Sequence, residues 1–104
     1  MDNFKVIYKI LKTLEKAMDV DEFDTGLISP EALGISQRRW CAIIAMLVEN
    51  GYIKGVGLMK TMGYETVKVK NIQITLKGLE YLDENSFMKK AANLAKGIAD
   101  IIPG

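Results

Sequence analysis

Four polar side chains stand together directly before the most apolar helical stretch of the chain: Ser36, Gln37, Arg38 and Arg39. An arginine can bridge two acceptors of guanine, a glutamine can bridge a donor and an acceptor of adenine, and a serine hydroxyl can bond a phosphate. Such side chains at the start of a helix suit contact with base edges in a DNA major groove. The four residues are therefore a candidate DNA-binding group.

Positive charge is concentrated in the same part of the chain. Residues 36–78 hold seven lysines and arginines against two acids, a balance of +5, whereas residues 1–35 have a balance of −3 and residues 79–104 a balance of −1. Four of these cations follow the apolar stretch as Lys54, Lys60, Lys68 and Lys70. This asymmetry favours an anionic partner, and the alternative is that these side chains are ordinary solvated surface.

The residue types that most enzymes and metal sites need are scarce. The chain has no histidine and one cysteine, which removes the commonest general base, the commonest zinc ligand and an internal disulfide. The acids at 19–24 do not form a calcium loop, because the fifth position from Asp19 is Phe23 and the twelfth is Pro30. We expect no cofactor, no metal and no enzymatic activity, and a hydrolase built on the 19–24 acids is a third alternative.

The length and the start of the chain indicate the class of protein. The 104 residues suit one domain, and a hydrophobic content of 49% allows a core. No apolar run reaches the roughly 18 residues of a membrane-spanning helix. The first residues lack the basic and apolar segments of a signal peptide. Together with the single cysteine, these features predict a cytoplasmic protein that does not enter the membrane.

Hydrophobic periodicity and capping residues predict the order of elements. Apolar spacings of three and four predict helices, and alternation predicts a strand at 65–74 with a bend at Asn71. Ser29, Gly34 and Ser36 bracket one short helix and begin the next. In chain order we expect a helix at 3–18, an acidic loop at 19–26, a short strand at 27–28, helices at 29–34 and 36–50, strands at 52–59 and 65–74 joined by a turn at 60–64, and helices at 75–84 and 87–102.

This order predicts an α+β fold that is mainly α: a winged helix-turn-helix with a two- or three-stranded antiparallel wing sheet and an extra C-terminal helix. Residues 1–86 would form the winged-helix domain, and residues 87–104 an amphipathic helix that belongs to the same domain or acts as a dimerisation arm. The wing places Lys60 at its turn and Lys54, Lys68 and Lys70 along its strands. There they could neutralise phosphates or reach the minor groove.

Four stretches carry a resemblance to a known family: FKVIYKILKTLEKAMD, ISPEALGIS, the Trp40 helix with ENGYIKGV, and ITLKGLEYLDENS. In these stretches the sequence resembles the YjcQ family, small winged-helix proteins of Gram-positive bacteria and their phages. The resemblance covers nearly the whole chain and is least distinctive after Ser86. It implies the winged-helix fold and a phage or prophage context. For function it implies only the DNA binding expected of winged-helix proteins in general.

The middle of the helix at 36–50 offers no further contacts to bases. If its most apolar side faces the core, the rows that continue from the two arginines consist of Ile43 and Met46 on one side and of Ala42 and Ala45 on the other. None of these side chains can donate or accept a hydrogen bond in the manner that base recognition needs. Either the tip of the helix alone contacts DNA, or this face binds a protein.

Three further residue types have two interpretations each. The methionines at Met46, Met59 and Met62 suit an adaptable protein contact or fill the core. Trp40 either stacks on a partner or is buried against the first helix. Cys41 is expected to be an inert, buried side chain.

The last predicted helix has an apolar stripe that includes Phe87, Leu94, Ile98 and Ile101. This stripe would pair with a second copy in a homodimer or fold back on the first helix of its own chain. A dimer would present two DNA half-sites.

The sequence favours a module that binds double-stranded DNA as a dimer and regulates transcription. The alternative is a protein–protein interaction module that uses the third helix and the wing without binding DNA. A continuous positive face from Arg38 and Arg39 to the wing lysines would favour DNA. An exposed apolar patch around Ile43 and Met46 would favour a protein partner.

Overall fold

The computed structural model describes residues 2–61 and 64–85, with the backbone alone at 59–61 and 64–66. The fold is α+β and mainly α, with small antiparallel sheets, as the sequence predicted. The helix predicted at 87–102, with its proposed dimer residues, lies outside the described residues.

Helix α1 spans Asn3–Ala17 and forms one side of the core. It begins where the Asp2 carboxylate accepts a hydrogen bond from the Lys5 backbone N–H at 3.1 Å, which caps the helix. Its buried residues recur at helical spacing: Val6, Ile10, Leu11 and Leu14. The predicted first helix is therefore confirmed.

Two short helical elements connect α1 to the long central helix. The first is a 3₁₀ helix, η1, at Thr25–Ile28, where the sequence predicted a short strand at 27–28. That prediction is wrong because the Asp24 side chain accepts a bond from the Gly26 N–H and the Leu27 N–H bonds to the Asp24 carbonyl. These local bonds close the chain into a turn. The second is α2, Pro30–Leu33, which is capped by Ser29 and ended by Gly34 at φ 70°, as predicted.

Helix α3, Gln37–Glu49, is held in the core by Trp40. The indole is 5% exposed, and its Nε1–H donates to the Ile28 carbonyl at 2.8 Å, which fixes α3 to η1. The burial of Trp40 is thus confirmed, and stacking of this side chain on a partner is wrong. Cys41 is also buried, as predicted.

Each of the two predicted long strands is divided into two. Strand β1, Ile53–Lys54, pairs with β4, Gln73–Ile74, and strand β2, Gly57–Thr61, pairs with β3, Tyr64–Lys68. The first break falls at Gly55, where φ is 79° and a side chain would overlap the Asn71 carbonyl. The second break is the predicted bend at Asn71, where the Ile72 N–H bonds to the Val69 carbonyl at 3.1 Å.

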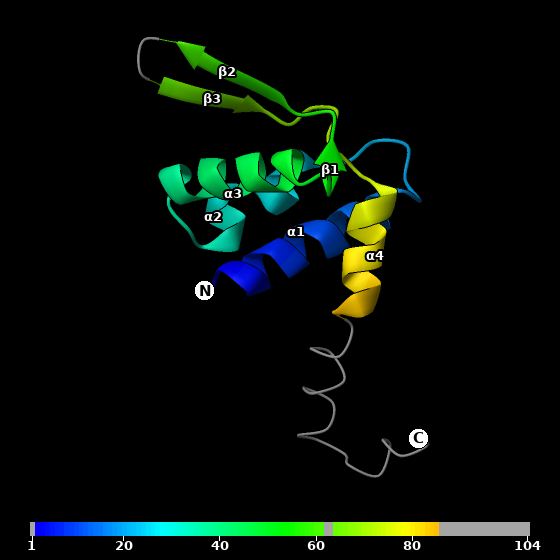
Figure 1. Ribbon diagram of the computed structural model, residues 1–104. Coiled ribbons are helices and arrows are strands. Elements are labelled where there is room, and N and C mark those ends of the chain that lie inside the picture. The colour runs from blue at the N-terminus through cyan, green and yellow to red at the C-terminus, as the bar shows by residue number, and fades with distance from the viewer. Residues whose placement is uncertain (1, 62–63, 86–104) are drawn as a thin grey trace, which may run out of the picture.

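The β2–β3 hairpin is the wing, and it lies along one side of α3, with α1 on the other side (Figure 1). Half-buried valines at the base of the hairpin pack against the core: Val56, Val67 and Val69. The central helix is therefore covered on two sides, and what remains of it is a single exposed row.

Helix α4, Leu76–Glu84, is seated on the small β1–β4 sheet through a glycine. A Cβ at Gly78 would overlap the Tyr52 carbonyl oxygen and lie 2.6 Å from Ile74 Cγ1. Because Gly78 and Leu82 face inwards one turn apart, Leu76 faces out and is 74% exposed. The apolar spacing of the sequence makes Leu76, Leu79 and Leu82 candidates for the inner face of this helix, and for Leu76 that expectation is wrong.

Substitution of Gly78 by alanine should disturb the packing of α4 on the β1–β4 sheet. A methyl group there meets backbone, so we expect a loss of about 1–3 kcal/mol in the free energy of unfolding, despite a gain in helix propensity of about 1 kcal/mol. Urea unfolding followed by Trp40 fluorescence measures this. Gly57→Ala is the matched control, because its Cβ would meet only Lys68 Cβ at an ordinary 3.5 Å. Equal stability of the two variants would contradict the close seating of α4.

Candidate nucleic-acid interface

The start of α3 carries three of the four predicted contact residues in exposed positions: Ser36, Gln37 and Arg38. The Ser36 hydroxyl oxygen accepts the Arg39 backbone N–H at 3.1 Å and caps the helix, so its own O–H remains a donor for a phosphate. The Gln37 amide lies 3.5 Å from Cys41 Sγ, a weak contact that a stronger acceptor can replace. This end of α3 therefore presents donors to solvent.

Arg39 has a different role from Arg38. Its Nε–H donates to the Asn3 side-chain oxygen at 2.8 Å, and the residue is half-buried. The bond joins the first turn of α1 to the first turn of α3, which are 36 residues apart in the chain. We assign Arg39 to holding the two helices together, whereas Arg38 is exposed.

The exposed row of α3 continues from Arg38 through Ala42 and Met46 to Glu49, with the half-buried Ala45 beside it. It offers methyl groups and a carboxylate, and no donor for a base or a phosphate. The Arg38 row is therefore as apolar as the sequence predicted, and Glu49 adds a negative charge near its end.

Ile43 does not form an exposed patch with Met46. It is 1% exposed, while Met46 is 45% exposed. The sequence allowed Ile43 to face outwards because it counted one apolar side to the helix. In the structure Ile43 belongs to the buried core cluster, so no exposed apolar patch joins it to Met46.

Three of the four predicted lysines gather at the base of the hairpin: Lys54 on β1, Lys68 at the end of β3, and Lys70 in the turn that follows. All three are exposed. Among the side chains that the structure describes, none of these three lysines forms an ion pair, whereas Lys12 and Glu15 of α1 do, at 2.8 Å. Their charge is available to an external anion.

Lys60 is not at the wing turn. Strand β2 continues to Thr61 and β3 begins at Tyr64, so Lys60 lies within the ladder, with its Cα opposite that of Glu65. The expected turn at 60–64 is therefore too long.

The candidate contacts form two groups at opposite ends of α3 (Figure 1). Arg38 lies in its first turn, and the lysines lie at the hairpin base that follows its last turn. A helix of 13 residues is about 20 Å long. At about 3.4 Å per base step, that length spans roughly six base pairs of duplex.

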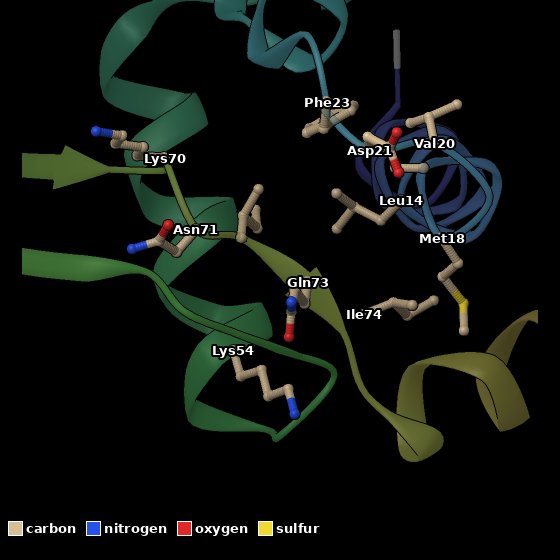
Figure 2. A pocket seen from close by; sticks show the side chains of 12 residues that line it. Leu14, Met18, Val20, Asp21, Phe23, Lys54, Lys70, Asn71, Gln73 and Ile74 are labelled. Atoms are coloured by element: carbon tan, nitrogen blue, oxygen red, sulfur yellow. The ribbon is translucent and has the colours of Figure 1, made fainter.

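A groove of about 560 Å³ lies beside the lysine group, and the sequence analysis missed it. One wall is the segment from Lys70 to Ile74, together with Lys54, and the other is the end of α1 with the loop that follows it (Figure 2). The available signal was the pair of apolar residues, Val20 and Phe23, among the acids of residues 19–24. Phe23 packs against the core.

A cluster of aromatic side chains supports the same end of the sheet. The rings of Tyr52 and Tyr81 are 5.3 Å apart, and the Lys77 ammonium lies 5.3 Å from the centre of the Tyr52 ring. Burial raises the pKa of the Tyr81 phenol, and the neighbouring Tyr52 raises this pKa further. Lys77 therefore belongs to the packing of α4 on β1.

In the part of the chain that the structure describes, no three histidine, cysteine or acidic side chains come close enough to hold a metal ion. None of the described helices has the length and apolar character to cross a membrane.

Substitutions of Arg38 and Arg39 should differ in their effects on the free energy of unfolding. Arg39→Ala removes the bond to Asn3, and we expect it to lower the free energy of unfolding by at least about 0.5–1.5 kcal/mol. Arg38→Ala changes an exposed position and should stay within about 0.5 kcal/mol of the parent. Chemical denaturation of both variants and of Asn3→Ala measures this. Equal effects of the two arginine substitutions would contradict the assignment.

Comparison with known proteins gives the fold and the family. The structure is similar to the solution NMR structure of the YjcQ protein from Bacillus subtilis, with a TM-score of 0.50 and 22% sequence identity over 78% of this chain and 92% of that chain. At this identity the likeness shows the fold. No curated protein matches the chain. The YjcQ protein family matches residues 8–101, and the chain therefore belongs to the YjcQ family.

Proposed function

We propose that the protein binds double-stranded DNA, chiefly through the phosphate backbone. The observation that carries this proposal is the group of three exposed lysines at the hairpin base, Lys54, Lys68 and Lys70, which have no acidic partner among the described residues. A protein that neutralises phosphates in this way gains affinity from the release of counterions. The winged-helix-like fold supports the proposal, because it sets these lysines near one end of a helix whose other end exposes Gln37 and Arg38.

Base reading is limited to the start of α3. Arg38 and Gln37 can reach base edges, and Ser36 can donate to a phosphate. Beyond the first turn the exposed row holds an alanine, a methionine and Glu49, and the last of these would repel phosphates. We therefore propose that only the N-terminal end of α3 enters a groove of the duplex, while the lysine group contacts phosphates nearby. Such an arrangement gives modest sequence specificity.

We also propose that the protein acts as a homodimer. A homodimer through Phe87, Leu94, Ile98 and Ile101, which lie outside the described residues, would double the number of phosphate contacts. Such a dimer suits a regulator of transcription, in the cytoplasm and in a phage or prophage setting. An analytical ultracentrifugation run on the full chain and on a chain ending at Glu84 distinguishes a dimer from a monomer.

The second candidate is a protein–protein interaction module. It is favoured by the apolar row on α3, in which Met46 is 45% exposed. Met59 and Met62 were predicted to share this role, but the side chain of Met59 and the whole of Met62 are outside the described part. With Ile43 buried, the exposed apolar area on α3 is smaller than the sequence suggested.

The direct test is a fluorescence-anisotropy titration with a mixed-sequence duplex at about 50 and 200 mM salt. Replacement of Lys54, Lys68 and Lys70 by alanine should weaken binding. It should also reduce the slope of log K against log salt by up to about 2.7, since each phosphate contact contributes about 0.9.

The matched control replaces Lys5, Lys9 and Lys16 by alanine. These are three exposed lysines of α1, so net charge changes equally. The control should leave the slope close to that of the parent protein. Equal losses in both triple variants would point to net charge alone, and absence of binding by the parent at low salt would rule out DNA as a partner of this chain alone.

A further inference from the structure

The groove beside the lysine group runs along the free edge of strand β4. Ile72, Gln73 and Ile74 all line it, although neighbouring residues of a strand point to opposite faces of a sheet. A cavity that three successive residues touch therefore follows the edge of the strand. In the described ranges β4 pairs with β1 alone, so its second edge carries no partner strand.

The backbone of β4 presents hydrogen-bonding groups at this edge. The Thr75 N–H donates to the Tyr52 carbonyl at 3.1 Å, which makes Thr75 and Tyr52 a hydrogen-bonded pair of the antiparallel ladder. In such a ladder the next residue directs its N–H and C=O away from the partner strand. That residue is Ile74, so its backbone groups point away from β1, towards the edge that borders the groove.

The two sides of the groove differ in chemistry. Its inner side is apolar and consists of Leu14 and Phe23 together with Ile72 and Ile74. Its outer side carries Gln73 between Lys70 at one end and Lys54 at the other (Figure 2). Across from them, Met18 and Val20 are 63% and 54% exposed, which is high for apolar side chains beside a cavity.

We propose that this groove binds an extended peptide segment of another protein, which adds to β4 as a third strand. Alternate side chains of a strand face opposite ways, so such a segment would direct apolar side chains to Leu14 and Phe23 and acidic side chains to Lys54 and Lys70. Asp21 on the opposite rim disfavours acids on the inner side and so fixes the register of the alternation. The volume of about 560 Å³ lies within the usual range of ligand sites.

This inference goes beyond DNA binding, and the two can be separated. Lys54 and Lys70 line the groove, whereas Lys68 does not. Lys68→Ala should weaken DNA binding alone. A peptide in the groove would compete with DNA for Lys54 and Lys70.

The probe is a fluorescein-labelled, capped hexapeptide of alternating valine and glutamate, titrated with the full chain. We expect this peptide to bind. A control hexapeptide of alternating valine and lysine should not bind. Methylation of alternate backbone nitrogens in the valine–glutamate peptide should weaken binding at least about tenfold, because it removes the ladder donors. Lys54→Glu/Lys70→Glu should weaken it at least about fivefold, while the control Lys5→Glu/Lys9→Glu on α1 leaves it unchanged.

Several results would overturn the proposal. Equal affinity for the methylated peptide would show apolar contact without strand addition, and equal affinity of the Lys54/Lys70 variant would remove the charge argument. Failure of the probe peptide to bind would exclude the site for this chemistry. A dimer that dissociates in Lys54→Glu/Lys70→Glu would assign the groove to a second copy of the chain. If the Lys54→Glu/Lys70→Glu variant does not fold, Lys54→Gln/Lys70→Gln takes its place in these measurements.

Discussion

The structure depends on the burial of α3 on two sides. Trp40 anchors α3 through its bond to the Ile28 carbonyl, Arg39 ties its first turn to α1, and the hairpin lies on the side of α3 opposite α1 (Figure 1). Because both sides are covered, one narrow row of the helix remains exposed. This constraint decides which residues of α3 can meet a partner.

The same constraint separates positive charge into two groups. Arg38 stands at the start of α3, and Lys54, Lys68 and Lys70 stand beyond its end, while the exposed row between them is apolar or acidic. A surface of this kind suits contacts with separate phosphates more than continuous insertion of a helix into a groove. It also leaves the lysine group beside the edge of β4, where one set of cations can serve a nucleic acid and a peptide.

Local chemistry made much of the fold predictable. The caps at Ser29 and Ser36 and the bend at Asn71 follow from residues a few positions apart, and all occur. The errors arise from tertiary packing. Gly78 turns α4 so that Leu76 faces out, and Ile43 is buried in the core. Of the candidate site, the exposure of Arg38 and of three lysines was predictable, whereas the engagement of Arg39 with Asn3 and the groove depend on contacts distant in sequence.

The most direct test of this account is a map of amide chemical-shift changes when a short DNA duplex is added to ¹⁵N-labelled protein. The account predicts changes at the start of α3 around Arg38 and at the hairpin base around Lys54, Lys68 and Lys70. It predicts little change at Ala45 and Glu49. Changes that run along the whole exposed row of α3, or changes confined to α1, would contradict it.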